Sequence, residues 1–348
     1  MYRNQCVLQT LIFCTAILTI TSCTRTTNAQ SELVMGTICS INLYKDGSKE
    51  NYRKLFARLK EIEDIFSANN DTSVMSLVNN NAGVNPQNVP AEFIDVLTRA
   101  LYFAEISDGA FDPTIGTVVK LWNIGTEDEV LPPIDKIQNA LRLVNWRDVI
   151  IDAEQQSVFL KQQGMKLDLG GIVKGYAADE LVRIIKELKI KCALIDLGGN
   201  IYVHGKKNRT SVWKIGVQDP ANKRGTYVGY VEVESGTLVT SGVYERYFEQ
   251  DGIRYHHILS TQTGYPVESG LDSVTIINTD ALYPTDPNDA HGMAHPSMDA
   301  DALSTTLFAL GYDKACILLK NFPNTGAIFI LHDGTIRQWG DSVNFKKM

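Results

Sequence analysis

The sequence predicts an α+β fold built on a largely antiparallel sheet with helices beside it. Closely spaced strand patterns dominate residues 193–278, where few helical patterns intervene. The segments 52–66, 91–107 and 299–310 instead carry apolar residues at helical spacing, so each predicts a helix that buries one face. No shift in composition divides residues 31–348. We therefore expect one compact unit with two closely joined lobes.

The N-terminus is typical of a signal peptide, which is removed before folding. A mostly apolar run (7–20) follows a positively charged start, and Cys23 follows small residues, as at the cleavage site of a bacterial lipoprotein. We predict a lipoprotein signal peptide at 1–22, a polar tether at 23–32 and a folded domain at 33–348. The chain would then be anchored by lipid on the periplasmic side of a bacterial membrane. A plain signal peptide is the alternative. A spanning helix needs about 20 apolar residues, and this run is shorter and more polar.

The composition is that of an ordinary globular chain with a mildly acidic surface. Of 348 residues, 44% are hydrophobic and 21% are charged, and the formal net charge of -7 argues against nucleic acid as the main partner. Beyond the signal and anchor region, Cys39, Cys192 and Cys316 are too scattered for a disulfide framework or a metal site.

The first half of the domain alternates helices with turns. Asp112 precedes a proline in one such turn, and a structural role is the default for an acid at that place. The predicted elements are a strand at 33–43, a helix at 52–66, a loop at 67–85, a helix at 91–107, an irregular segment at 120–147 with a short helix near 134–143, and a hairpin of 148–152 with 157–160.

The stretch 166–188 combines a short strand, a glycine turn and a helix. Residues 167–169 alternate apolar and acidic, two glycines follow, and apolar residues then recur at helical spacing. The amide groups of a helix start, together with Lys174, favour an anion, whereas Asp168 suits a metal or a sugar hydroxyl. An ordinary strand–turn–helix with a solvated lysine is an equal alternative for this stretch alone.

The second half is rich in strands and ends in a helix and a final strand. The segment 280–298 reads as an inserted surface loop, and its His291 and His295 would bind a metal only if that loop were helical, which its Pro, Gly and Asp residues oppose. The predicted elements are strands at 193–197, 201–204, 212–217, 227–233, 238–241, 254–259 and 273–278, a helix at 299–310 and a last strand at 327–331.

Asp301 and Thr305 stand at i and i+4 of the last predicted helix, so their oxygens point to one side. A carboxylate and a hydroxyl, joined by a backbone carbonyl, suit Mg²⁺ near phosphates. The alternative is that Asp299 or Asp301 caps the helix. A lone histidine is more often structural than catalytic, but His257 lies in a predicted strand just before a tight turn, which strengthens the case for a catalytic role.

Taken together, these stretches resemble the ApbE family, the FAD:protein FMN transferases. The resemblance covers nearly all of the mature chain, and the motifs follow one another in the family's order. They are a lipoprotein signal, Met35-Gly36-Thr37, FSANNDTSVMSLVN (66–79), AFDPTIG (110–116), LDLGGIVKGYAAD (167–179), IDLGGNIYVHG (195–205), WKIGVQDP (213–220), TSGVYERYF (240–248), YHHILSTQTGYPV (255–267) and DADALSTTLFALG (299–311).

The resemblance implies a reaction and a set of site residues. FAD would be cut at its pyrophosphate, FMN would pass to a threonine hydroxyl of a target protein, and AMP would leave. His257 is the implied general base, Gly171 (through its carbonyl), Asp301 and Thr305 are the implied Mg²⁺ ligands, and Met35, Asn69, Ala110, Phe111, Asp112, Asp168 and Lys174 are implied to bind FAD.

Two positions depart from the family pattern. Many members have an aromatic residue where Asn69 stands, and asparagine cannot stack on a flavin ring in the same way. Ser260-Thr261-Gln262 replaces the usual Asp-Pro-Arg, which removes a charge pair beside the turn. A loosely held flavin leaves room for a metal-dependent FAD pyrophosphatase that gives FMN and AMP. A flavin-binding lipoprotein without chemistry is the third reading. The implied targets are exported domains of membrane redox complexes, of the sodium-pumping NADH:quinone or Rnf type.

Overall fold

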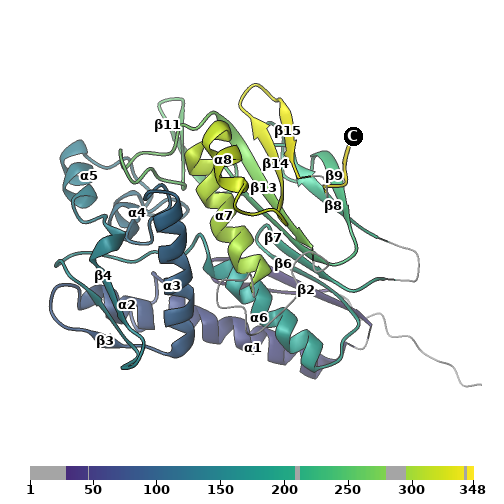
Figure 1. Cartoon of the computed structure of the whole chain (residues 1–348), viewed down its shortest axis with the longest axis horizontal. Helices are drawn as coiled ribbons and strands as arrows, with labels where there is room; N and C mark the ends of the chain where they lie inside the picture. Colours follow the sequence, from purple (N-terminus) through teal and green to yellow (C-terminus); the bar gives the residue numbers. More distant parts are fainter. Residues whose placement is uncertain (1–28, 46, 208–211, 280–294, 341–342) are drawn as a thin grey trace, which may run out of the picture.

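The structure is a computed structural model that describes residues 29–45, 47–207, 212–279, 295–340 and 343–348. Within these residues, the largest unit is an eight-stranded sheet in the order β1-β2-β6-β7-β10-β13-β14-β15, in which every pairing is antiparallel (Figure 1). The α+β prediction is confirmed. The strands of this sheet are β1 (Gln30–Val34), β2 (Thr37–Lys45), β6 (Cys192–Leu197), β7 (Asn200–His204), β10 (Gly236–Gly242), β13 (Leu271–Thr279), β14 (Gly326–Leu331) and β15 (Ile336–Trp339).

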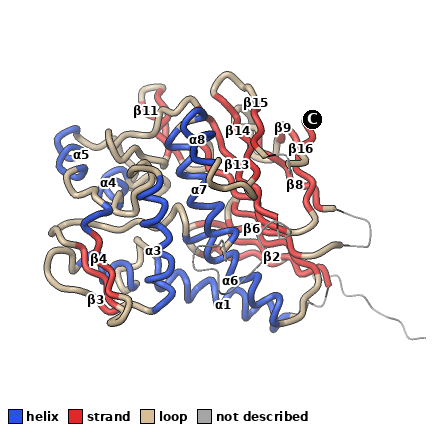
Figure 2. The backbone as a smooth tube through the Cα atoms, in the orientation of Figure 1, coloured by secondary structure: helices blue, strands red, loops and turns tan. Residues whose placement is uncertain are grey.

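Helices cover one face of the sheet and a small sheet covers the other (Figures 1 and 2). On the helical face, Ile41 and Ile195 of the sheet share one core with Leu59, Leu181 and Leu303 of the helices. The helices, with apolar residues every 3.6 positions, and the strands, with apolar residues every second position, bury these side chains against one another there. This burial is the main source of stability. The covering elements are α1 (Lys49–Phe66), α6 (Val173–Glu187), α7 (Pro296–Leu310) and α8 (Tyr312–Leu319) on one face, and β8 (Trp213–Gln218), β9 (Tyr227–Val233) and β16 (Phe345–Lys347) on the other.

A second group of elements lies beside the sheet and carries most of the short helices (Figure 1, left). Its own small core surrounds Trp122, whose indole N–H donates to the Gly264 carbonyl at 2.8 Å. Phe93 and Phe103, however, belong to the same core as the sheet, so the two groups are closely joined. The elements are α2 (Val74–Asn80), α3 (Ala91–Ile106), α4 (Gly116–Trp122), α5 (Ile134–Leu141), a 3₁₀ helix (Trp146–Asp148), β3 (Gln87–Asn88), β4 (Val149–Asp152), β5 (Ser157–Leu160), β11 (Tyr247–Gln250) and β12 (Ile253–His256).

Helix α7 is buried on nearly all sides and is anchored at its start by two carboxylates. Asp179 of α6 accepts hydrogen bonds from the backbone N–H groups of Ser297 and Met298, at 3.1 and 2.9 Å, and so caps the helix. Asp299 forms a bidentate pair with Arg99 of α3, with N–O distances of 2.6 and 2.7 Å. These contacts fix α7 against both groups of elements.

Several predictions of the strands were wrong. The predicted strand at 33–43 is a hairpin, because Met35 (φ 55°) and Gly36 (φ 67°) make a two-residue turn that pairs Val34 with Thr37. The hairpin begins at Gln30, so residues 30–32 of the predicted tether are also strand. β14 is not the last strand either, since α8 precedes it and β15 and β16 follow it.

The segment 167–169 is extended but is not a strand of a sheet. Only Lys166 makes a bridge, to Ile115. Leu167 is held instead by the Asn79 side chain, which accepts from its N–H at 2.7 Å and donates to its carbonyl at 3.0 Å. A side-chain amide thus replaces a neighbouring strand, and no periodicity reveals that.

Three segments predicted as loops contain helix. Ser73 caps α2 by accepting from the Ser76 N–H at 3.0 Å, within the predicted loop at 67–85. α4 ends at Trp122, inside the segment predicted to be irregular. Of the predicted loop at 280–298, residues 296–298 start α7, and 280–294 lie outside the described residues. None of the described helices combines the length and apolar character needed to cross a membrane.

Replacing Arg99 by alanine should lower the free energy of unfolding by about 3 kcal/mol, because it leaves the buried Asp299 carboxylate without its partner. Arg53→Ala is the matched control: it breaks the exposed pair with Glu50, so urea unfolding should be essentially unchanged. If both variants unfolded at the wild-type urea concentration, the anchoring of α7 by Arg99 would be refuted.

Candidate active site

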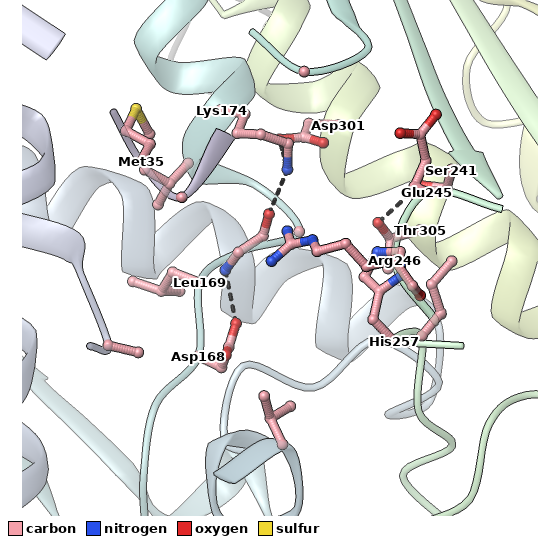
Figure 3. Close-up of a pocket in the computed structure, with 18 of the residues that line it drawn as sticks. Met35, Asp168, Leu169, Lys174, Ser241, Glu245, Arg246, His257, Asp301 and Thr305 are labelled. Atoms are coloured by element: carbon pink, nitrogen blue, oxygen red, sulfur yellow. Dashed lines mark hydrogen bonds and ion pairs between the residues drawn. The ribbon is translucent and has the colours of Figure 1, made fainter. Parts of the chain in front are cut away.

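A cavity of about 380 Å³ opens where the sheet meets the helical group, and its wall includes every residue predicted for the site. Figure 3 shows Asp168, Lys174 and Asp301 on one part of the wall and His257 on another. The structure therefore brings together the turn between β1 and β2, the end of α1, the start of α6 and the middle of α7. The predicted residues in the wall are Met35, Asn69, Ala110, Phe111, Asp112, Asp168, Gly171, Lys174, His257, Asp301 and Thr305.

The glycine turn before α6 is closed by its own side chains. The Asp168 carboxylate accepts from the Gly170 N–H at 2.8 Å, and the Lys174 ammonium donates to the Gly170 carbonyl at 2.8 Å (Figure 3). Both charged groups still line the cavity. They are therefore positioned by the turn, with one negative and one positive group facing a ligand.

Asp301 reaches this turn because α6 and α7 cross in close contact. A Cβ on Gly175 would lie 2.2 Å from the Ser297 carbonyl oxygen, so only glycine allows the crossing. The Gly175 N–H donates to Asp301 at 2.9 Å. Burial raises the pKa of the Asp301 carboxyl, and the Lys174 ammonium, 3.8 Å away, opposes that rise.

Oxygen atoms gather beside Asp301, one turn further along α7. The Thr305 hydroxyl lies 3.2 Å from the Ser241 hydroxyl. A Cβ on Gly171 would lie 3.3 Å from the same Thr305 oxygen, which places the Gly171 backbone against it. The set offers a carboxylate, hydroxyls and backbone carbonyls, the donors that a hard cation such as Mg²⁺ takes when phosphates and water complete its shell.

The capping alternative for Asp299 and Asp301 is wrong. Asp179 caps α7, Asp299 pairs with Arg99, and Asp301 lies too far into the helix to cap it. For the other metal alternative, His291 lies outside the described residues and His295 precedes α7. Among the described residues, no group of three or more His, Cys, Asp or Glu side chains could hold a metal ion.

His257 follows β12 and is held by the backbone of Arg246, which lies just before β11. Its backbone N–H and its Nδ1 lie 3.1 and 3.2 Å from the Arg246 carbonyl oxygen. A carbonyl oxygen only accepts, so Nδ1 carries the proton and Nε2 keeps its lone pair. Burial, with the positive charges of Arg246 and Lys174, lowers the pKa of His257 to about 3. The imidazole is therefore neutral and able to accept a proton.

The residues predicted to face the flavin come from three separate turns. Met35 occupies the left-handed hairpin turn, where its N–H donates to Glu63 of α1 at 2.7 Å. Asn69 is exposed on the loop after α1. Phe111 is buried edge-on against Phe103, with ring centroids 6.3 Å apart. This part of the wall mixes apolar and polar side chains and has no aromatic residue at position 69.

Asp112 lines the cavity, but its carboxylate organises the surrounding turn. One oxygen accepts from the N–H and hydroxyl of Thr114, at 2.8 and 2.7 Å, and the other from the Trp146 N–H at 3.0 Å. Burial raises the pKa of this carboxyl. The structural role expected of an acid before proline is therefore present.

The turn at 260–264 is held by the hydroxyl groups of its own side chains. The Ser260 hydroxyl accepts from the N–H groups of Gln262 and Thr263, both at 3.2 Å, and the Thr261 hydroxyl donates to the Gly109 carbonyl at 2.7 Å. The Thr261 hydroxyl thus joins this turn to the segment that carries Ala110 and Phe111.

Sequence reasoning missed Ser241, Glu245, Arg246 and Arg224, which also line the cavity. The first three belong to the motif 240–248, which was noticed without a role for any of its residues. The i, i+4 spacing on a helix identified Asp301 and Thr305. The end of a strand and the turn after it, where Ser241, Glu245 and Arg246 lie, have no such spacing that indicates which side chains face the cavity.

The chain is similar in sequence to curated FAD:protein FMN transferases. That of Treponema pallidum (strain Nichols) is 39% identical over 329 residues, covering 89% of this chain and 86% of the relative. That of Klebsiella pneumoniae (strain 342) is 36% identical over 300 residues, covering 86% of this chain and 88% of the relative. The crystal structure of the ApbE protein from Thermotoga maritima matches with a TM-score of 0.77 at 31% identity, covering 90% of this chain and 97% of that chain.

The sequence profile of the ApbE family matches residues 35–291, a span that contains most of the cavity wall. The family, the relatives and the fold agree with the resemblance seen in the sequence motifs. The chain therefore belongs to the ApbE family.

Proposed function

We propose that this chain is an FAD:protein FMN transferase that moves FMN from FAD to a threonine hydroxyl of a target protein and releases AMP. Its curated relatives carry that name. The observation that carries the proposal is the pairing, in one cavity, of a neutral His257 with the oxygen donors of Asp301 and Thr305. Such a cavity suits a reaction in which a weak nucleophile attacks a phosphate.

His257 would take the proton of the incoming threonine at Nε2. The Arg246 carbonyl oxygen holds the ring in the tautomer that leaves this nitrogen free. The negative pyrophosphate of bound FAD would raise the pKa of His257 toward the working pH, because an opposite charge favours the imidazolium. Lys174 and the amide groups at the start of α6 would hold phosphate oxygens.

Gly171, Asp301 and Thr305 would hold Mg²⁺, whose charge would neutralise the pyrophosphate and the leaving AMP. The oxygen-only donor set supports this choice, because Mg²⁺ is commonly bound by one or two carboxylates together with substrate phosphates and water. Met35, Asn69, Ala110 and Phe111 would line the flavin and ribityl region, and Asp168 would contact a hydroxyl of FAD. Asp112 would act there by shaping the turn.

A metal-dependent FAD pyrophosphatase is the second candidate. Asn69 favours it, because an exposed amide on the flavin side of the wall leaves the ring without an aromatic neighbour at that position. Water could then replace threonine as the nucleophile. A flavin-binding protein without chemistry is the third candidate, and long retention of intact FAD with Mg²⁺ would favour it.

We also propose that the chain is an exported lipoprotein anchored through Cys23 on the periplasmic side of the membrane. The basis is the sequence pattern of residues 1–23, which lie outside the described residues. The targets would then be exported domains of membrane redox complexes, such as the sodium-pumping NADH:quinone or Rnf-type systems.

Mass spectrometry after incubation with FAD and Mg²⁺, with and without a candidate target domain, separates the three candidates. A transferase adds the mass of FMN to the target, and the addition disappears when the acceptor threonine is replaced by alanine. FMN and AMP formed equally fast without the target would establish the pyrophosphatase. No turnover of FAD would leave the binding role.

His257→Ala should slow FMN transfer by about 10²–10⁴-fold, because the threonine hydroxyl loses its proton acceptor. FAD binding, measured by flavin fluorescence, should change much less. His256→Ala is a neighbouring control whose ring contacts the Val267 carbonyl and does not line the cavity. Transfer at more than a tenth of the wild-type rate in the His257 variant would assign the histidine a structural role.

Asp301→Asn should lower metal-dependent transfer by about 100-fold or more, the effect of losing several kcal/mol of charge stabilisation. Asparagine keeps an oxygen for the Gly175 N–H, so the thermal unfolding midpoint should fall little. Titration with Mn²⁺, followed by electron paramagnetic resonance, should show weakened metal binding. Undiminished Mn²⁺ affinity would contradict the assignment of Asp301 as a ligand.

The pH profile of kcat/KM for FAD, which reports the enzyme before FAD binds, should lack the fall in acid that an ordinary catalytic histidine causes. For an imidazole with a pKa of about 6.5, the neutral fraction falls about 30-fold between pH 7.5 and pH 5. The pKa of about 3 for His257 keeps the free enzyme's base neutral throughout that range. We expect no comparable fall between pH 7.5 and 5, with activity recovered on return as the control. A limb centred near pH 6.5 would show that burial and the neighbouring charges do not lower this pKa.

A further inference from the structure

We propose that Arg246 is a further catalytic residue, whose guanidinium contacts the phosphoryl group as it passes from FAD to the threonine hydroxyl. This inference rests on the proposed transferase function. It assigns a role to a cation that the sequence motifs left without one.

Arg246 presents an unengaged positive charge to the cavity. The side chain is exposed and lines the wall, and Figure 3 shows its guanidinium extending from the His257 side toward the Gly170 turn. Within the part of the chain that the structure describes, its side chain has no recorded hydrogen bond or ion pair. A guanidinium in such a place has all its N–H groups available to a ligand.

The backbone and stem of Arg246 are nevertheless fixed. Its carbonyl oxygen accepts from both the backbone N–H and the ring of His257, at 3.1 and 3.2 Å. Its stem passes over Gly125, where a Cβ would lie 3.0 Å from the arginine Cδ. Gly125 also has a φ of 84°, so glycine is favoured there for two reasons. The base and the guanidinium are thus held together at the open end of the β11–β12 hairpin.

Lys174, another cation of the wall, is already engaged. Lys174 donates to the Gly170 carbonyl at 2.8 Å and lies 3.8 Å from Asp301. Burial raises the pKa of Glu245, and among the neighbouring charges that of Arg224 most opposes this rise. Asp196, Lys174 and Arg246 act on Glu245 more weakly. Arg246 lines the same wall and its backbone binds His257, so its guanidinium is placed to meet a phosphate beside that ring.

The chemistry requires positive charge at that place. The bond from the threonine oxygen to the FMN phosphorus forms while the bond from that phosphorus to the AMP oxygen breaks. The threonine proton goes to Nε2 of His257, and AMP leaves with the bonding electron pair. Charge spreads over the equatorial oxygens of the phosphoryl group in between, and the planar fork of a guanidinium matches two such oxygens.

The test is single-turnover FMN transfer by Arg246→Ala and Arg246→Lys, with wild-type protein and Arg254→Ala measured in parallel. Arg254 is the matched control, because it pairs with Glu249 on the surface of β12 and does not line the cavity. Arg246→Ala should transfer FMN about 10²–10³-fold more slowly. Arg246→Lys should lie between, and Arg254→Ala within about twofold of wild type.

Two further readouts separate catalysis from structure and from binding. Added guanidinium ion should partly restore transfer by Arg246→Ala, which a merely structural role would not allow. The Kd for FAD should rise less than about tenfold, since the contact strengthens in the transition state. Wild-type transfer rates in Arg246→Ala, or a loss confined to FAD affinity, would overturn the proposal. Absence of transfer by the wild type would overturn the proposed function instead.

Discussion

The close crossing of α6 and α7 at Gly175 is the constraint on which the site depends. With a Cβ 2.2 Å from the Ser297 carbonyl, any other residue would push the helices apart. Their contact sets the Gly170–Lys174 turn beside Asp301 and Thr305 and lets the Gly175 N–H bind the Asp301 carboxylate. Asp179 secures the same crossing from the other side by capping α7. The positions of the Asp301 carboxylate and the Thr305 hydroxyl in the cavity thus depend on backbone contact between two helices.

The polar groups of the site divide into those that build it and those that face a ligand. Asp112 and Asn79 are buried and Asp179 is partly buried, and their hydrogen bonds close turns or cap a helix. Lys174 and His257 keep free donors or lone pairs while one contact positions each of them. A buried polar group without a hydrogen-bond partner costs free energy of folding. A site therefore needs fully hydrogen-bonded groups around it to hold in place the groups that face the ligand.

Prediction from sequence succeeded where periodicity or a local motif carried the information. Helices α1, α3, α6 and α7 followed from their apolar faces, and the ordered motifs named residues that line one cavity. It failed where a single contact decides the structure. Met35 in a left-handed turn breaks the first strand into a hairpin, and the Asn79 amide substitutes for a strand beside Leu167. The inward direction of Arg246 depends on Gly125, which lies far away in the sequence. Such long-range pairs leave no trace in local patterns.

The wall of the cavity runs from Met35 in the first hairpin to Ala309 near the end of α7. Contacts between such distant parts of a chain have a high contact order, and they form only when most of the domain has folded. The cavity is therefore a property of the complete fold, and no smaller folded unit contains it. A ligand that binds there acts on the folding equilibrium of the whole domain by mass action, so its free energy of binding adds to global stability.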